Sequence, residues 1–260
     1  MKIAVLVKQT PDSETRINLP GPVPELDDSG FSRVLNPYDA FAVEEAVQIK
    51  ERLGEGTEAV AITVGPERVM ETIKKDCLAV GCDRAIRVDD PALAKAEPLA
   101  VARVLAKVLE RDQYDLILCG KQAIDDDSAQ VGVMVAELLN LPHAAVVTAL
   151  ELGDGTFTAT CEIEGGQQVV TGPLPAVITC QKGLNEPRLP SLPNIMKANM
   201  KPVEVLSLAD LGMEAPAPTV TVTSYSPPPA RGECKIIEND DPAEAARELV
   251  RLLREEAKVI

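Results

Sequence analysis

The chain has 260 residues, which is long enough for one large domain or two small ones with a sizeable buried core. Its 41 acidic and 26 basic side chains leave a net charge of −15, which argues against nucleic acid and anionic membrane surfaces as partners, because both attract basic patches. The apolar runs are too short to span a bilayer, and Met1 and Lys2 lead directly into an apolar strand, so we expect a cytoplasmic protein without membrane insertion.

The amino-terminal half alternates between strand-like and helix-like segments. Apolar runs predict strands at residues 2–7, 58–64, 84–88 and 115–119. Helical spacing predicts helices at residues 37–53, 66–81, 98–111 and 131–139, the last with an apolar face of Val131, Met134, Val135 and Leu138. The alternation predicts a doubly wound, mostly parallel, Rossmann-like α/β sheet with helices on both faces.

The first helix has a strong start signal. Asn36 is suited to the N-cap, Pro37 to the first helical position and Asp39 to the positive end of the helix dipole. Residues 8–30, which precede it, contain four prolines and are predicted as a loop or an edge hairpin. The spacing predicts a buried stripe and a solvent-exposed charged face, the latter with Glu44, Glu45, Lys50 and Glu51.

Residues 119–132, CGKQAIDDDSAQVG, connect the fourth predicted strand to the next helix. Ligands of open α/β sheets collect at such carboxyl ends of strands. Gly120 lets the backbone approach a ligand, and Ser128 is expected to cap the helix and leave amides for a phosphate. Asp125, Asp126 and Asp127 would repel an anion, so they should point at hydroxyls, backbone amides or solvent. A solvated acidic loop that starts a helix is the alternative interpretation.

The second half contains shorter strands with glycine-containing turns. Strands are predicted at residues 144–152, 156–163, 168–171 and 176–180, as an antiparallel extension of the sheet. Pro187, Pro190 and Pro193 then predict a stretch without regular structure. That stretch is apolar for a loop, with Leu189, Leu192, Ile195 and Met196. It is a candidate for protein docking, and a loop packed against its own domain is the alternative.

The carboxyl-terminal part is predicted as an extended arm. Residues 215–241 are rich in proline, and residues 242–258 form an amphipathic helix with an apolar stripe of Ala245, Leu249, Leu252 and Leu253. We therefore divide the chain into an α/β nucleotide-binding domain, residues 1–214, and an arm, residues 215–260. Such an arm often embraces a neighbouring subunit, and a helix packed on its own domain is the alternative.

Several common sites are absent from the sequence. Residues 54–59 match the G-x-G-x-x-[GA] string but precede a strand, whereas a dinucleotide fingerprint must follow one, and there is no P-loop. Six cysteines form no CxxC pair, so we expect reduced and mostly buried thiols. His143, the only histidine, excludes a metal site built from several histidines, and we expect it to pack structurally.

No constellation of nucleophile and base is present, which predicts a protein that is not an enzyme. Two alternatives of other classes stay open. Asp125, Asp126 and Asp127 with Mg²⁺ could serve a nucleotide-hydrolysing enzyme, and a stand-alone nucleotide sensor would be a stable monomer.

Several motifs together resemble one family. GKQAIDDD at residues 120–127 and LNEPRLPSLPNIMKA at residues 184–198 resemble the beta subunit of electron transfer flavoprotein, and so do NPYD at 36–39, VEEA at 43–46 and VGP at 64–66. The motifs occur in the family's order over nearly the whole chain. The resemblance implies a heterodimer with an alpha subunit that carries the redox-active FAD, while the beta subunit holds a structural AMP.

The family's nucleotide contacts fall on four places of this sequence. The corresponding residues are Leu6, Asn36, Pro37, Tyr38, Asp39, Val64, Gly120, Lys121, Gln122, Ala123, Ile124, Asp125, Asp126, Asp127, Ser128, Ala129, Gln130 and Val131. The FAD contact just after the first strand is a tyrosine in many members, and the matching position here is Ser13. Bifurcating relatives bind a second FAD in place of AMP, but the retained Asp126 and the LPNIM string favour AMP.

The resemblance also implies protein partners. It implies docking of flavin dehydrogenases of the acyl-CoA dehydrogenase type at Leu192, with Arg188, Pro193, Ile195, Met196 and Lys197 around it. Electrons would pass through the FAD to an electron transfer flavoprotein–quinone oxidoreductase and the quinone pool. Glu162 matches a glutamate that pairs with an alpha-subunit arginine near the flavin.

Overall fold

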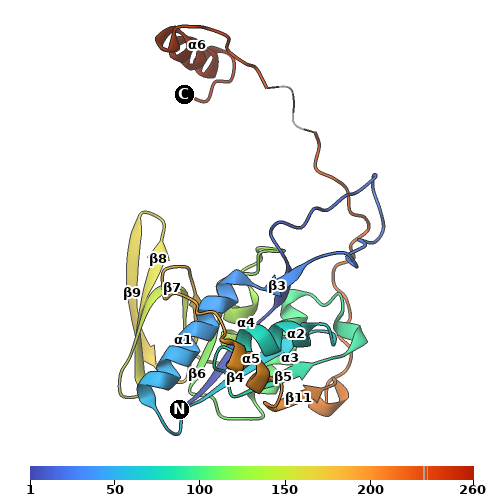
Figure 1. The fold of residues 1–260 in the computed structure, drawn as a ribbon, viewed down its shortest axis with the longest axis vertical. Coiled ribbons are helices and arrows are strands. Elements are labelled where there is room, and N and C mark those ends of the chain that lie inside the picture. The colour runs from blue at the N-terminus through green and yellow to red at the C-terminus, as the bar shows by residue number, and fades with distance from the viewer. Residues whose placement is uncertain (231, 233) are drawn as a thin grey trace. The chain divides into compact units, whose positions relative to one another are not determined.

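A nine-stranded sheet with the order β11-β5-β4-β1-β6-β10-β7-β8-β9 is the frame of the protein (Figure 1). The computed structural model describes residues 1–230, 232 and 234–260. The strands are β1 (Lys2–Leu6), β4 (Glu58–Val64), β5 (Arg84–Val88), β6 (Leu116–Gly120), β7 (His143–Leu152), β8 (Thr156–Ile163), β9 (Gly166–Pro173), β10 (Ala176–Cys180) and β11 (Val203–Leu206). This confirms the predicted mixed α/β class with a mostly parallel central sheet.

The topology reverses direction next to β1. After β1 the chain forms β4 and β5 on one side, and it then returns to form β6 on the other side of β1, with all of these strands parallel. In doubly wound sheets such a reversal leaves a crevice at the carboxyl ends of the two central strands, because their helices leave toward opposite faces. The ends of β1 and β6 are therefore the place at which a ligand site is expected.

Alternating residues of the strands feed two hydrophobic cores. Ile3 and Val5 of β1 face one core, whereas Ala4 and Leu6 face the other, as the two-residue period of a strand requires. The first core is covered by α1 (Pro37–Leu53), by the short α2 (Val69–Thr72) that continues into a π-helix (Ile73–Leu78), and by α5 (Leu192–Ala198). The second is covered by α3 (Pro98–Leu109) and α4 (Val131–Leu138) (Figure 1).

One prediction about the strands was wrong, and one strand was not predicted. β10 is not part of an antiparallel extension, because it pairs in parallel with both β6 and β7, and only β7, β8 and β9 form the antiparallel part. β11 was not predicted, and it pairs in parallel with β5 at the opposite edge of the sheet. Strand direction depends on partners far along the chain, so the local pattern carried no signal for it.

The prolines of residues 184–198 do not prevent a helix, contrary to the prediction. α5 begins at Leu192, and Ser191 caps it by accepting a hydrogen bond from the Asn194 amide at 3.4 Å. Pro193 lies in the first turn of α5, where a missing N–H costs nothing because the amides of that turn have no partner within the helix.

Smaller differences concern segment ends and faces. β2 (Gln9–Pro11) and β3 (Arg33–Leu35) pair in antiparallel fashion as a separate two-stranded sheet, so residues 8–30 are mostly loop and contain only the first of these two strands. Two short 3-10 helices, Pro91–Leu93 and Ala209–Leu211, lie between the larger elements. Leu138 was predicted on the apolar face of α4, but its side chain is exposed, because α4 ends there.

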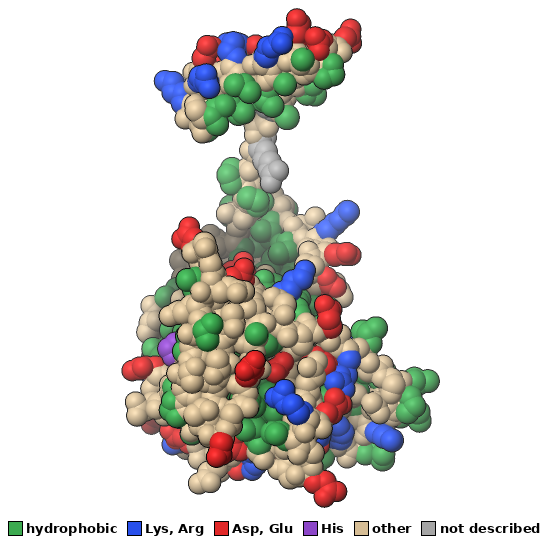
Figure 2. Space-filling view, turned by 90° about the vertical axis from the view of Figure 1, so that its left-hand side faces the viewer, with side chains coloured by type: hydrophobic (Ala, Val, Ile, Leu, Met, Phe, Trp, Pro, Cys, Tyr) green, Lys and Arg blue, Asp and Glu red, His purple; other side chains and the backbone are tan. Residues whose placement is uncertain are grey.

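The chain divides into two units. The first comprises residues 1–17 and 27–223, and the second comprises residues 18–26 and 224–260. In the second unit Val23 and Tyr225 form an antiparallel bridge, and Asp241 caps α6 (Pro242–Glu255). Apolar side chains lie along one side of α6 and charged ones along the other (Figure 2), and Leu249 is 48% exposed. None of the helices in the described part of the chain is long and apolar enough to cross a membrane.

Candidate functional site

The carboxyl ends of β4, β1 and β6 lie side by side and carry most of the predicted nucleotide contacts. Leu6 is paired with Ile62 of β4 and with Cys119 of β6, so the next residues of all three strands leave the sheet at the same edge. Leu6 is buried against the second core, and Val64 ends β4 at this edge. Of the predicted contacts, residues 36–39 and 120–131 are brought together here by direct hydrogen bonds.

Asp39 joins the first turn of α1 to both central strands. Its carboxylate accepts the Lys8 amide at 2.7 Å and the Gly120 amide at 2.9 Å, which are the backbone groups just after β1 and at the end of β6. Burial raises the pKa of the Asp39 carboxyl to about 7, although the Lys8 and Gly120 amides and the Lys8 charge act in the opposite direction. Asp39 therefore fixes the turn backbone as well as lying at the helix N-terminus.

Asn36 occupies the N-cap position but does not cap α1 with its side chain, contrary to the prediction. Its amide nitrogen donates to the Gln122 carbonyl at 2.8 Å, and its Oδ1 accepts the Ile124 amide at 3.2 Å. The side chain thus shapes the turn after β6, where the backbone needs partners outside regular structure. Pro37 is the first residue of α1, as predicted.

Gly120 is required by the close packing of the turn on α1. A Cβ atom at this position would lie 2.7 Å from the carbonyl carbon of Tyr38 and closer still to Asp39 Oδ1. No other residue type fits there without movement of the backbone. Lys121, the next residue, places its ammonium 5.1 Å from the centre of the Tyr38 ring. A cation therefore lies beside the start of the turn.

Each of the three aspartates has a partner within the protein, but only Asp126 accepts a backbone amide, which was one of the predicted options. Lys8 Nζ lies 2.8 Å from Asp125 and 3.3 Å from Asp126, and Asp127 accepts the Gln122 side chain at 2.7 Å. Burial acts to raise the pKa of Asp126, but its hydrogen bond from Ser128 and the Lys8 charge lower that pKa overall.

The prediction that Ser128 caps the next helix was wrong. The Ser128 amide donates to Asp126 at 3.1 Å, and α4 begins three residues later, with Gln130 at the N-cap and no side chain as a cap. Asp127 and Ala129 have φ angles of 50° and 52°, in the left-handed region that non-glycine residues rarely adopt. The amides of the first turn of α4 are thus left without a side-chain acceptor, which suits the binding of an anion.

The predicted docking residues lie elsewhere, on and before α5. Leu189 and Leu192 are 91% and 73% exposed, and Met196 and Met200 are exposed as well. Pro193 and Lys197 are also at the surface, whereas Ile195 is half-buried and packs against the first core. The structure therefore presents part of this segment, which we call the docking segment (residues 184–198), as an apolar surface.

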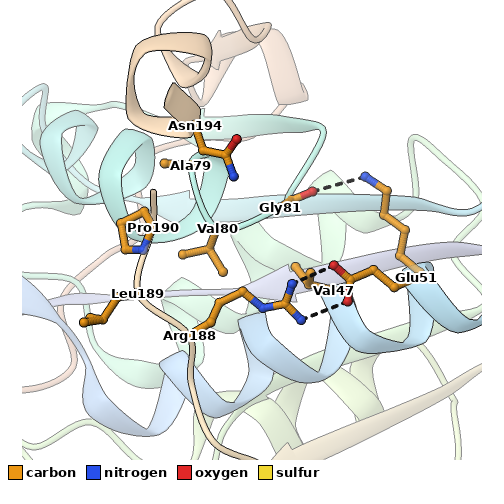
Figure 3. A pocket seen from close by; sticks show the side chains of 10 residues that line it. Val47, Glu51, Ala79, Val80, Gly81, Arg188, Leu189, Pro190 and Asn194 are labelled. Atoms are coloured by element: carbon orange, nitrogen blue, oxygen red, sulfur yellow. Dashed lines mark hydrogen bonds and ion pairs between the residues drawn. The ribbon is translucent and has the colours of Figure 1, made fainter. Parts of the chain in front are cut away.

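Arg188, a predicted partner contact, is bound within the chain. It donates from Nε and Nη2 to both oxygens of Glu44 at 2.9 Å. It also donates from Nη1 and Nη2 to Glu51 at 2.6 and 2.9 Å, and Figure 3 shows these bonds to Glu51. Glu44 and Glu45 were predicted on the exposed face of α1, and this was wrong, because both are buried. Their partners are about 140 residues away in sequence, so helical spacing gave no sign of them.

A cavity of about 260 Å³ lies beside this ion pair and not at the turn after β6. Val47, Val80, Leu189 and Pro190 give it apolar walls, and Arg188 and Glu51 lie at its side (Figure 3). Two further predicted residues lie outside both regions. Glu162 is the last residue but one of β8 and accepts the Gln181 side chain at 2.9 Å, and Ser13 is exposed in the loop after β2.

The other chemistry-bearing residues do not form a second site. Within residues 1–230, 232 and 234–260, no group of three His, Cys, Asp or Glu side chains is arranged to hold a metal ion. All six cysteines are free thiols, and five of them are buried, as the prediction of reduced and mostly buried thiols requires.

The sheet order, the reversal next to β1 and the turn that leaves β6 define a protein of the doubly wound α/β class. Residues 25–211 match the electron transfer flavoprotein domain. The chain is 40% identical to the electron transfer flavoprotein subunit beta of Bacillus subtilis over the full length of both chains. It is 40% identical to that of Bradyrhizobium diazoefficiens, again over both full chains, and 37% identical to the human one, over 97% of this chain and 99% of the human chain. The chain therefore belongs to the electron transfer flavoprotein family, among its beta subunits.

Proposed function

We propose that this chain is the AMP-binding beta subunit of a heterodimeric electron transfer flavoprotein of the non-bifurcating type. It binds AMP as a structural group, helps to hold the FAD domain of the alpha subunit, and docks flavin dehydrogenases of the acyl-CoA dehydrogenase type. Electrons then pass through the FAD to the quinone oxidoreductase and the quinone pool. The chain itself catalyses no bond-making reaction. We place the protein in the cytoplasm. The observation that carries the proposal is the turn at residues 120–131, which hydrogen bonds to Asp39 and Asn36 fix at the reversal of the sheet.

The donors at this turn fit an adenylate. The uncapped first turn of α4 and the Lys8 and Lys121 side chains supply N–H groups and positive charge for a phosphate. Gly120 keeps the backbone free of a side chain where a nucleotide must approach closely. The three aspartates are already paired with Lys8, Gln122 and Ser128, which disfavours the alternative in which they bind Mg²⁺ for hydrolysis.

The retained Asp126 and the LPNIM string at residues 192–196 favour AMP over a second FAD. The experiment is co-purification of the chain with its alpha subunit, followed by acid extraction and identification of the released nucleotides. We expect one AMP and one FAD for each heterodimer. Two flavins would show the bifurcating type, and the absence of any adenylate would refute the proposed role of the turn.

The contacts with the alpha subunit are proposed from three features. α6 presents an apolar stripe with the exposed Leu249 and Val250, which a partner surface would bury. Residues 215–260, which include α6, would form the arm that contacts the alpha subunit, and residues 1–214 the nucleotide-binding domain. Glu162 is at the surface at the end of β8, where it can meet an arginine beside the flavin.

Docking of dehydrogenases is proposed at Leu192. An exposed leucine among the apolar neighbours Leu189 and Met196 is an unusual surface for a free protein, and a single apolar side chain can dominate a small interface. Leu192→Ala is therefore expected to raise the KM of the heterodimer as electron acceptor of an acyl-CoA dehydrogenase.

A further inference from the structure

We infer that Glu44 and Glu45 of α1 act as positioning residues for dehydrogenase docking, because they hold the docking segment in place through Arg188 and Asn185. This inference rests on the proposed docking at Leu192 and adds to it a defined cause for the position of that side chain. It assigns the hydrogen bonds of the Arg188 guanidinium to partners within the subunit, and not to a docking protein.

The contacts form a continuous set between one helix and the start of the segment. Asn185 donates to Glu45 and to the Phe41 carbonyl, each at 3.0 Å. Arg188 binds Glu44 with two parallel bonds of 2.9 Å, and its own backbone amide lies 3.3 Å from the same carboxylate. A two-pronged pair of this kind fixes the direction of the guanidinium plane as well as its distance.

Arg188 has little capacity left for another protein. Its side chain makes four hydrogen bonds to Glu44 and Glu51, and a guanidinium has about five N–H donors in total. Glu44 is only 2% exposed, so release of Arg188 to a partner would leave a buried carboxylate without its cation. That is one of the costlier changes inside a protein, which keeps Arg188 in place.

The remainder of the segment is short and is fixed at its far end. Ser191 caps α5, and Ile195 and Ala198 pack against the first core. Leu192 lies between these two attachments, with its side chain outward. Without the attachment to α1, residues 185–191 would lose their fixed path, and Leu192 would reach its docking position in only a fraction of molecules. The apparent affinity falls by that fraction, although no docking contact has changed.

The test compares two glutamates that bind the same arginine. Glu44→Gln removes the negative charge of the buried carboxylate that binds Arg188. Glu51→Gln makes the same chemical change at the exposed carboxylate on the same helix. Both variants are prepared as heterodimers with the alpha subunit, together with Leu192→Ala and the double variant of Glu44→Gln and Leu192→Ala. The assay measures KM and kcat for electron transfer from a substrate-reduced acyl-CoA dehydrogenase.

We expect Leu192→Ala and Glu44→Gln each to raise KM about tenfold with kcat within about twofold, which corresponds to roughly 1.4 kcal/mol of docking energy. Glu51→Gln should change KM less than about threefold, since exposed ion pairs contribute little. The double variant should resemble Leu192→Ala, because Glu44 acts through that side chain. Trypsin should cut after Arg188, within the released stretch, faster in Glu44→Gln than in Glu51→Gln.

Each other outcome has a distinct meaning. If Leu192→Ala leaves KM unchanged, the proposed docking site is wrong. If Leu192→Ala raises KM while Glu44→Gln does not, or if the two effects add in full, the positioning role is refuted. Should Glu44→Gln fail to assemble, Arg188→Lys replaces it, because lysine keeps the charge but not the two-pronged geometry. A normal KM in Arg188→Lys would then overturn the inference.

Discussion

Gly120→Ala tests whether the packing of the turn on α1 is as tight as the structure shows. The added methyl carbon would lie 2.7 Å from the Tyr38 carbonyl carbon, whereas ordinary contacts begin at 3.4 Å. The turn or the first turn of α1 must therefore move by several tenths of an ångström. α1 cannot easily move, because Ala42, Ala46 and Ile49 on its own inner face are completely buried.

The cost has two parts. Overpacking a site of this kind costs about 1–3 kcal/mol, and loss of the Gly120 amide bond to Asp39 leaves a buried acceptor that adds about 1–3 kcal/mol. A total of about 4 kcal/mol corresponds to a drop of roughly 10 °C in Tm for a chain of this size. The displaced turn should also hold less AMP.

The assay is thermal unfolding of the purified heterodimer at one fixed protein concentration, because Tm depends on concentration in an oligomer. The amount of AMP released by acid is measured on the same sample. Gly30→Ala is the matched control, since its Cβ would meet nothing within 4 Å. A Tm of Gly120→Ala within about 2 °C of the control, with normal AMP, would refute the argument from packing.

Three further predictions concern charge and the arm. Because the pKa of Asp39 is raised to about 7 in the folded protein, the folded state holds a proton that the unfolded state releases above its ordinary, lower pKa. The free energy of unfolding that this group contributes is thus present in acid and is lost as the pH rises to 7. In urea unfolding, the difference in free energy of unfolding between wild type and Asp39→Asn should therefore shrink by roughly 2–3 kcal/mol from about pH 5 to 7. A constant difference would contradict the raised pKa. Lys8→Met removes an exposed ion pair worth less than about 1 kcal/mol, yet should lower AMP retention on dialysis several-fold, and equal retention would exclude Lys8 from the phosphate site. Leu249→Glu places a charge on the apolar side of α6 and should weaken the heterodimer in sedimentation experiments, whereas Glu248→Gln, on the charged side of the helix, should not.

Features with a local cause were predicted well from the sequence. The strands at 156–163 and 176–180 have the predicted bounds, because an apolar or alternating run between turn residues determines them within a few positions. α1 has its predicted bounds for a similar reason, with Pro37 at its start and Gly54 after its end. The turn after β6 was predicted at the carboxyl end of a parallel strand because its residues follow a strand and precede a helix.

Features that depend on distant partners were missed. The direction of β10 is determined by β6 and β7, and the burial of Glu44 and Glu45 by Arg188 and Asn185. A charged side chain on a helix is expected in solvent unless a partner is known, and helical spacing contains no information about such a partner. Asn36 illustrates the same limit, because a good capping residue was used instead to bind the turn after β6.

α1 connects the two proposed functions of the first unit, since its first turn binds the Gly120 turn and its next turns bind the docking segment. Between these two attachments lie Ala42 and Val43, which are only 0% and 1% exposed. A disturbance at one end must displace this stretch from the sheet before it reaches the other end, and close packing resists that movement. The two functions should therefore be separable by mutation, with Gly120→Ala lowering AMP content at normal docking and Glu44→Gln weakening docking at normal AMP content. The helix would then act as a rigid support that fixes where the docking segment lies relative to the nucleotide turn, and not as a path that transmits nucleotide binding to the partner surface.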